Sequence, residues 1–285
     1  LTFHGIPLMD VVRDHGTPLR LTYLPKIGQK VDEARSLFQT AMAMNAYPAT
    51  YTPCYCTKSS HFAFVLEEAL KHEAHLETSS AYDIDIIWQL AAEGKLSADT
   101  YILCNGFKPK NYTDRIADLI SAGYGNTVPI LDNPEELALY QHQIDQPLQL
   151  GLRLATEEEP QFEFYTSRLG MGRDDLMELY RSQIKEAPQL QLKLLHFFVN
   201  SGIRDDGYYW NELAKAVHCY CDLKAECPEL DSLDIGGGLP VPQSLNFSYN
   251  YEQIARQIIT NIQQICNERG VAPPHLFTEF GQYTV

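Results

Sequence analysis

The sequence predicts an α/β fold built as one closed (β/α)8 barrel, the TIM-barrel architecture. Short apolar runs alternate with amphipathic stretches, which is the pattern of parallel strands joined by helical crossovers. The alternation repeats eight times, and eight repeats fit a closed barrel better than an open doubly wound sheet. The chain length of 285 residues also exceeds the roughly 250 that such a barrel needs.

The expected strands are short and apolar, and the stretches between them show helical periodicity. We expect strands at residues 49–57, 75–78, 100–105, 128–132, 148–154, 192–199, 233–235 and 276–279. We expect helices at residues 62–72, 84–93, 134–141, 174–186, 209–225 and 251–269.

The residues before the first barrel strand differ in character. A run typical of a turn at residues 16–19 leads into a strand-like segment at residues 20–23. We therefore assign residues 1–25 to a leading segment that belongs to another domain and residues 26–285 to the barrel domain.

The composition excludes several classes of partner. A formal net charge of -15 argues against nucleic acid, whose binding requires a basic face. No apolar run approaches the roughly 20 residues of a membrane-spanning helix. No secretory signal is recognisable, so we expect a cytoplasmic protein whose seven cysteines are reduced. None of the cysteines shows the paired spacing of a zinc site, and we expect no metal.

Lys58 is the first candidate for chemistry, because the active site of a (β/α)8 barrel lies at the carboxyl ends of the strands. It ends the run Tyr55-Cys56-Thr57-Lys58. A barrel mouth could desolvate its amine, remove its proton and allow a Schiff base. Taken alone, a lysine in this position is more often a solvated loop residue.

Two further signals follow later strands. Three glycines, Gly236, Gly237 and Gly238, would let backbone N–H groups approach a phosphate, although a flexible turn is the alternative. Glu279 ends the last strand and would lie on the same face as Lys58, where a carboxylate could pair with a protonated ring nitrogen. A strand-end charge facing solvent is the alternative for Glu279.

Taken together, these segments resemble the fold-type III pyridoxal-phosphate decarboxylases, which act on ornithine, arginine and diaminopimelate. The likeness covers residues 16–283. Residues 55–58 are similar to the Tyr-x-x-Lys cofactor motif of that family, and residues 279–283 are similar to its Glu-Pro-Gly-Arg-Tyr. The resemblance implies pyridoxal 5′-phosphate as cofactor, bound as a Schiff base at Lys58.

The resemblance also implies a set of site residues. Lys58 and Glu279 would be catalytic, and residues 167–170 resemble the family's Ser-Lys-Phe-Gly turn. The residues implied in cofactor binding are Lys58, Glu77, Arg153, Phe198, Ser201, Gly236, Gly237, Gly238, Glu279, Gly281 and Gln282.

The chain departs from the family pattern at two of these positions. Phe198 replaces a histidine that stacks on the cofactor ring; phenylalanine can stack but cannot form a hydrogen bond. Gln282 replaces an arginine that pairs with the phosphate, which removes a charge-assisted contact worth about 1.5 to 3 kcal/mol.

Residues 103–108 and 195–197 resemble biosynthetic arginine decarboxylases, so arginine is the favoured substrate over ornithine, lysine or diaminopimelate. The reaction would yield a polyamine precursor, and the resemblance implies a homodimer. Two other functions remain open. The first is a catalytically silent relative that binds the cofactor and regulates a partner, which the two departures motivate. The second is a barrel enzyme without this cofactor that uses Glu279 as acid or base.

The resemblance implies a second, β-rich domain after residue 285, which this chain does not contain. Residues 20–23 would pair into that domain's sheet. We therefore expect that residues 1–285 alone bind the cofactor weakly and do not decarboxylate arginine at an enzymatic rate, and that the native polypeptide is longer.

Overall fold

The computed structural model describes residues 1–285 except 142, 145, 157–168, 243 and 245. Eight parallel strands form a closed barrel in the order β10-β3-β4-β5-β6-β7-β8-β9, which confirms the predicted (β/α)8 fold. Each of the eight expected strands is present. Their bounds are β3 (Tyr51–Cys56), β4 (His75–Thr78), β5 (Ile102–Cys104), β6 (Thr127–Leu131), β7 (Leu148–Leu154), β8 (Leu190–Phe197), β9 (Ser232–Asp234) and β10 (His275–Glu279).

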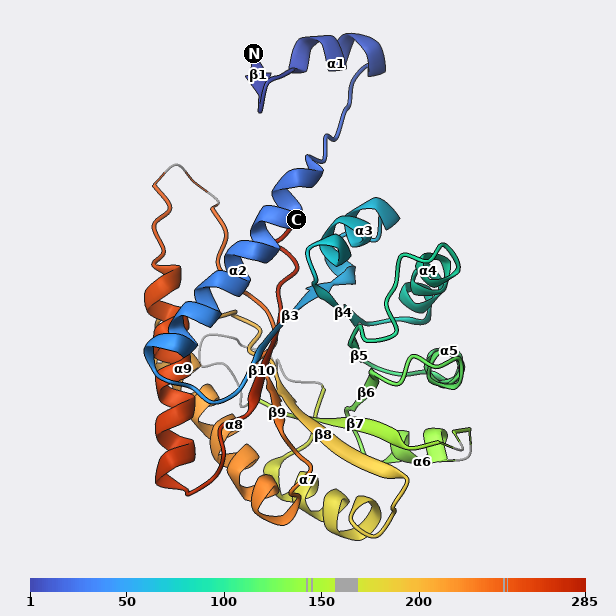
Figure 1. The fold of residues 1–285 in the computed structure, drawn as a ribbon, viewed down its shortest axis with the longest axis vertical. Helices are drawn as coiled ribbons and strands as arrows, with labels where there is room; N and C mark the ends of the chain where they lie inside the picture. The colour runs from blue at the N-terminus through green and yellow to red at the C-terminus, as the bar shows by residue number, and fades with distance from the viewer. Residues whose placement is uncertain (142, 145, 157–168, 243, 245) are drawn as a thin grey trace, which may run out of the picture.

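Helices surround the barrel on its outer side (Figure 1). Among the described residues, none of the helices is long and apolar enough to cross a membrane. The helices are α2 (Leu24–Met44), α3 (Ala63–Lys71), α4 (Ala81–Ala92), α5 (Lys110–Ser121), α6 (Glu135–Gln141), α7 (Arg173–Leu179) with a π-helical turn at Tyr180–Ile184, α8 (Gly207–Glu226) and α9 (Tyr251–Glu268).

Two of these helices, α2 and α5, were not predicted from the sequence. On α2, Ile27, Val31 and Phe38 recur at helical spacing and are buried, so the periodicity needed to predict this helix was present. The helix precedes the first barrel strand, and a strand-then-helix alternation predicts no helix at that place. On α5, Ile116 and Ile120 are buried in the same way, but polar residues in its first turns hide the pattern.

Local capping explains where α8 and α9 begin. The side chain of Asp206 accepts a hydrogen bond from the Tyr209 backbone N–H at 2.8 Å. The side chain of Asn250 accepts one from the Gln253 backbone N–H at 3.0 Å. Each cap satisfies a donor that the first helical turn leaves free.

The core has an outer and an inner part. The outer part fills the space between strands and helices. The inner part is a small cluster from five strands, which closes the barrel interior below its mouth. Its buried members are Cys54, Leu103, Val128, Ile130, Leu194 and Phe277.

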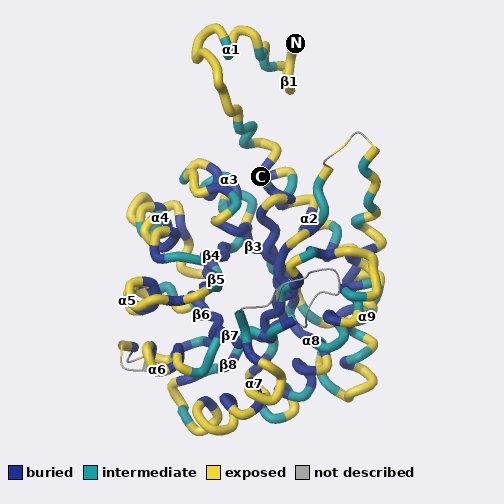
Figure 2. Tube along the Cα trace, turned by 180° about the vertical axis from the view of Figure 1, so that it is seen from behind, coloured by how far each residue is buried: buried dark blue, intermediate teal, exposed yellow. Residues whose placement is uncertain are grey.

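The N-terminal segment stands away from the barrel and is mostly exposed (Figure 2). It consists of a hairpin of β1 (Thr2–Phe3) and β2 (Ile6–Pro7), followed by α1 (Leu8–His15), which buries no residue. The strand expected at residues 20–23 was wrong: these residues have no regular structure, because no strand in the described part of the chain pairs with them. The division at residue 25 stays a prediction.

A substitution at Gly151 on β7 would test how tightly the barrel interior is packed. A Cβ at this position would lie 2.9 Å from Ile130 Cγ1 and 3.3 Å from Leu194 Cδ2, and the strand register shifts here. We predict that Gly151→Ala lowers the free energy of unfolding by about 1 to 3 kcal/mol through overpacking. Urea denaturation measures this. The control is Gly125→Ala, where a Cβ meets nothing within 4 Å; equal stability of the two variants would contradict the prediction.

Candidate active site

The mouth of the barrel collects the polar residues that follow the strands. Lys58 lies in a 3-10 turn directly after β3, Glu77 lies in β4, and Glu279 ends β10. In the closed barrel, β3 pairs with β10 on one side and with β4 on the other. Lys58 is thereby placed between two carboxylates, with its Nζ 3.7 Å from Glu77 Oε2.

A hollow of about 520 Å³ opens at this mouth, a size within the roughly 300 to 1,000 Å³ typical of small-molecule sites. Seven of the residues predicted to bind a cofactor line it. They are Lys58, Phe198, Gly237, Gly238, Glu279, Gly281 and Gln282. The structure therefore brings these residues to one place, and their roles stay predictions.

The other predicted residues lie around this hollow or apart from it. Ser201 lines an adjoining hollow, and Gly236 lies against Phe198, whose ring is 2.9 Å from where a Cβ of Gly236 would be. Arg153 does not line the hollow; its guanidinium is 3.7 Å from Asp132 Oδ1. Two of the four residues of the turn predicted at residues 167–170, namely 167 and 168, lie outside the described residues.

The amine of Lys58 is charged rather than neutral, which corrects the expected loss of its proton by desolvation. Burial opposes the charge, but the carboxylates of Glu77 and Glu279 outweigh burial and raise the pKa of Lys58 above its ordinary value. The side chain is 57% exposed, so desolvation is incomplete. The ammonium group of Lys58 must therefore lose its proton before its nitrogen can attack a carbonyl carbon.

Glu77 is fully buried beneath Lys58 and accepts a hydrogen bond from the Cys56 thiol. Burial and the negative charge of Glu279 raise the pKa of Glu77 to about 7, although the Lys58 ammonium works in the opposite direction. Glu77 is therefore a carboxyl group that gains and loses its proton near neutral pH.

Three buried residues that the sequence analysis did not assign to the site surround Glu279. Asn105 donates a hydrogen bond from its amide to Glu279 Oε1. His196 Nε2 lies 3.6 Å from the same oxygen. Asp234 is near enough that one ligand atom each from His196, Asp234 and Glu279 lie within 4.8 Å of one another. Such a group could also hold a metal ion, so the expectation of no metal stays untested.

Within this cluster, Asp234 holds its proton more strongly than Glu279 does. Burial and the adjacent Glu279 raise the pKa of Asp234 well above its ordinary value. Burial opposes the charge of Glu279, but its contacts with His196, Lys58 and Asp234 outweigh burial and lower the pKa of Glu279. Burial lowers the pKa of His196, whose imidazole is then neutral at neutral pH. Glu279 is therefore a buried carboxylate that keeps its negative charge.

A signal for these three residues was present in the sequence. Asn105, His196 and Asp234 all lie at or near the carboxyl ends of predicted strands. The rule that drew attention to Lys58 and Glu279 applies to them equally. Asn105 and His196 also belong to the two segments that carried the resemblance to arginine decarboxylases, yet we assigned them no place in the site.

The glycines after β9 pack closely against the backbone of neighbouring loops. A Cβ at Gly237 would lie 2.3 Å from the carbonyl oxygen of Glu279, and one at Gly238 would lie 2.6 Å from Gly202 Cα. Any side chain here would displace the backbone, so these positions require glycine. The loop keeps bare backbone at the edge of the hollow, where N–H groups can approach an anion.

The mouth fits a cofactor with a carbonyl group, a basic ring nitrogen and a phosphate. Lys58 offers an amine, Glu279 a lasting negative charge, and the glycine loop a bare backbone edge. Several buried polar atoms around the mouth have no hydrogen-bond partner among the described residues, which is unusual in a protein interior and consistent with a site that receives a ligand. They include Glu77 Oε1, Asn105 Oδ1, His196 Nδ1 and Asp234 Oδ2.

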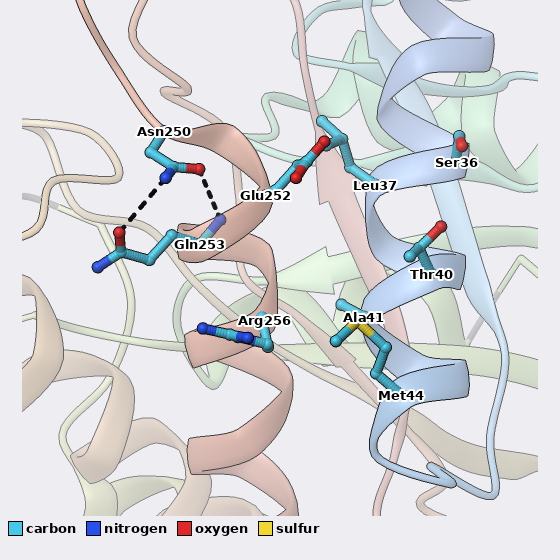
Figure 3. Close-up of a pocket in the computed structure, with 9 residues that line it drawn as sticks. All are labelled: Ser36, Leu37, Thr40, Ala41, Met44, Asn250, Glu252, Gln253 and Arg256. Atoms are coloured by element: carbon cyan, nitrogen blue, oxygen red, sulfur yellow. Dashed lines mark hydrogen bonds between the residues drawn. The ribbon is translucent and has the colours of Figure 1, made fainter.

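A separate groove of about 310 Å³ lies on the outer side, between α2 and α9 (Figure 3). Ser36, Thr40 and Met44 line it from α2, and Glu252 and Arg256 line it from α9. None of the predicted site residues lines this groove.

Comparison with known proteins agrees with this geometry. Residues 29–285 match the family described as "Pyridoxal-dependent decarboxylase, pyridoxal binding domain". The chain belongs to this family. Pyridoxal 5′-phosphate, the cofactor expected from the sequence, is therefore confirmed at the level of the family.

Several curated relatives are arginine decarboxylases. The chain is 26% identical to "Arginine decarboxylase 2" of Arabidopsis thaliana, over 94% of the chain and 40% of the relative. It is 27% identical to the "Biosynthetic arginine decarboxylase" of Vibrio cholerae, over 95% of the chain and 45% of the relative. The chain thus spans less than half the length of these two relatives.

Solved structures share the fold. The biosynthetic arginine decarboxylase of Campylobacter jejuni superposes with a TM-score of 0.81 at 20% identity, covering 97% of this chain and 47% of the other. The diaminopimelate decarboxylase of M. jannaschi superposes with a TM-score of 0.83 at 16% identity, covering 100% of this chain and 65% of the other. At these identities, the likeness concerns the fold.

Removing the charge of Glu77 tests whether this carboxylate raises the pKa of Lys58. We predict that Glu77→Gln lowers the pKa of Lys58 by roughly 1 unit, because it removes a carboxylate 3.7 Å from the amine. Pyridoxal 5′-phosphate should then attach covalently to the variant faster than to the unchanged protein. The rate is measured by absorbance at pH values from 6 to 10. The difference should appear above about pH 7, where Glu77 is ionised in the unchanged protein.

The control for this test is Glu135→Gln, at an exposed position at the start of α6. Identical pH profiles for Glu77→Gln and the unchanged protein would show that Glu77 does not set the charge of Lys58.

Proposed function

We propose that this chain is the cofactor-binding barrel of a pyridoxal-phosphate-dependent carboxy-lyase that converts arginine to agmatine and carbon dioxide. One observation carries the proposal: Lys58 and Glu279 line the same hollow, between a glycine loop and a half-buried aromatic ring, that of Phe198. The cofactor is held by an amine at its carbonyl group, by a carboxylate that stays ionised at its ring nitrogen, and by backbone N–H groups at its phosphate.

Each of these residues has a defined task. Lys58 binds the cofactor covalently through its amine once the amine has lost its proton. Glu279 would hold a proton at the ring nitrogen of the cofactor, whose ring would supply the electron sink for decarboxylation. Phe198 gives the ring an apolar surface to pack against.

The cluster behind Glu279 supports that task. Although Glu279 is buried, its contacts with His196, Lys58 and Asp234 lower its pKa, so its carboxylate stays negative. Asn105 holds the carboxylate in one orientation through its amide hydrogen bond. A fixed negative charge in a water-poor site acts more strongly on a ring nitrogen than it would in water.

The proposed substrate rests on the relatives and on two sequence segments. The curated relatives described above are named arginine decarboxylases. In the structure, Asn105 and His196 contact Glu279, and Lys108 is buried 3.1 Å from Glu136 Oε2. These residues therefore support a shared cofactor environment, and the guanidinium of arginine must be recognised by other groups.

We extend the proposal to the setting of the enzyme. We place it in polyamine biosynthesis in the cytoplasm, as a homodimer with a small-molecule amino-acid substrate. The leading segment of residues 1–25, which is mostly exposed, would belong to a β-rich domain.

A catalytically silent relative that binds the cofactor and regulates a partner is the second candidate. Phe198 and Gln282 favour it, because both line the hollow without a hydrogen-bonding ring or a positive charge. The two candidates share cofactor binding and differ only in release of carbon dioxide.

We predict that Lys58→Ala abolishes covalent cofactor binding, because among the described residues that line the hollow only Lys58 offers an amine. Borohydride reduction followed by mass spectrometry measures the covalent adduct. The control is Lys110→Ala, whose exposed amine pairs with Asp114 at 2.7 Å. A cofactor still trapped on the Lys58→Ala protein would overturn the assignment.

We predict that Glu279→Gln leaves cofactor affinity within a few-fold but lowers the rate of carbon dioxide release from arginine by roughly a hundredfold or more. The neutral amide cannot hold the ring nitrogen protonated. Release is assayed in the full-length protein with arginine, ornithine, lysine and diaminopimelate. Full activity of the variant would refute the role of Glu279, and no release by the unchanged protein from any of the four would favour the silent relative.

A further inference from the structure

A second hollow, of about 320 Å³, adjoins the one that holds Lys58. The two hollows share four lining residues, Asn200, Gly238, Leu239 and Gln282, so they are continuous. Two of these four, Gly238 and Gln282, lie in the segments that resemble the family's phosphate-binding residues. Ser201, the third such residue, lines the second hollow only.

The backbone ties the two loops of this second hollow together. The Ile203 N–H donates a hydrogen bond to the Gly238 carbonyl oxygen at 3.0 Å. A Cβ at Gly202 would lie 2.5 Å from the same oxygen, so the loop after β8 runs in contact with the loop after β9. The next residue, Arg204, is thereby fixed at the rim of the hollow, which its side chain lines.

Arg204 is the one charged side chain among the described residues that line the second hollow. The two acids that follow it are engaged elsewhere. Asp205 accepts a hydrogen bond from Trp210 Nε1 at 2.9 Å, and Asp206 caps α8. No ion pair among the described residues uses the Arg204 guanidinium, which is exposed and free to meet an incoming anion.

We propose that Arg204 binds the phosphate of the cofactor and supplies the positive charge that Gln282 lacks. This proposal rests on the proposed function, because it assumes a cofactor with its carbonyl group at Lys58. With Lys58 and Glu279 in the first hollow, the second is the continuous space left for the phosphate, between Ser201, the glycine loop and Arg204.

Guanidinium suits this task because it forms paired, charge-assisted hydrogen bonds to phosphate oxygens. Lys30, another cation near the hollows, is poorly placed to bind the phosphate. Lys30 Nζ lies 4.4 Å from the ring centre of Tyr283, which lines the first hollow, and pairs with Glu33 at 2.7 Å. The charge lost at position 282 is therefore replaced from the loop after β8.

The test compares binding of pyridoxal 5′-phosphate with binding of pyridoxal, which has no phosphate. In the full-length protein, we expect Arg204→Gln to weaken the affinity for pyridoxal 5′-phosphate about tenfold or more and to leave the affinity for pyridoxal unchanged. Both affinities come from absorbance titrations of the ligand bound at Lys58. The matched control is Arg256→Gln, which removes an arginine from the groove between α2 and α9.

A second variant keeps the test decisive. Adding Gln282→Arg to Arg204→Gln returns a positive charge to the same hollow, and we expect it to restore the affinity for pyridoxal 5′-phosphate. If Arg204→Gln binds both ligands as tightly as the Arg256→Gln control does, Arg204 has no such role. If pyridoxal 5′-phosphate does not bind at Lys58 even in the unchanged protein, the proposed function falls and the role of Arg204 with it.

Discussion

The pairing of β10 with β3 closes the barrel, and the geometry of the site depends on it. Glu279 lies opposite Cys54 in this ladder, and Cys56 lies opposite Glu77 in the next one. Lys58 follows two residues after Cys56, so closure places its amine between acids that are far apart in the sequence. A register shift of one residue would turn Glu279 away from the interior and separate it from Lys58.

Buried charge at the mouth is the second constraint. Glu77, Asp234 and Glu279 are all buried, and three ionised carboxylates this close together would repel one another. Burial and this repulsion together raise the pKa of Asp234 well above its ordinary value and the pKa of Glu77 to about 7. Glu279 alone keeps a lasting charge, which suits a group that must hold a proton on a ring nitrogen. Of these three buried acids, Glu279 is therefore the one whose carboxylate can hold a proton on the cofactor ring.

The strands could be predicted from the sequence because each is a short apolar run between helical stretches. The α2 helix was missed because it stands outside that alternation, although Ile27, Val31 and Phe38 carried the pattern. The strand-end rule could have placed Asn105 at the barrel mouth, but its contact with Glu279 depends on how the barrel closes, which no local pattern encodes. The charge of Lys58 was predicted wrongly because it depends on acids from two neighbouring strands.

The central claim is that the cofactor lies between Lys58 and the glycine loop with its ring nitrogen at Glu279. A crystal structure of the protein with pyridoxal 5′-phosphate tests this most directly. The account predicts density continuous with Lys58 Nζ, a ring nitrogen within hydrogen-bonding distance of Glu279, and a phosphate between Gly238 and Arg204. A cofactor bound away from Lys58, or with its ring nitrogen turned from Glu279, would contradict it.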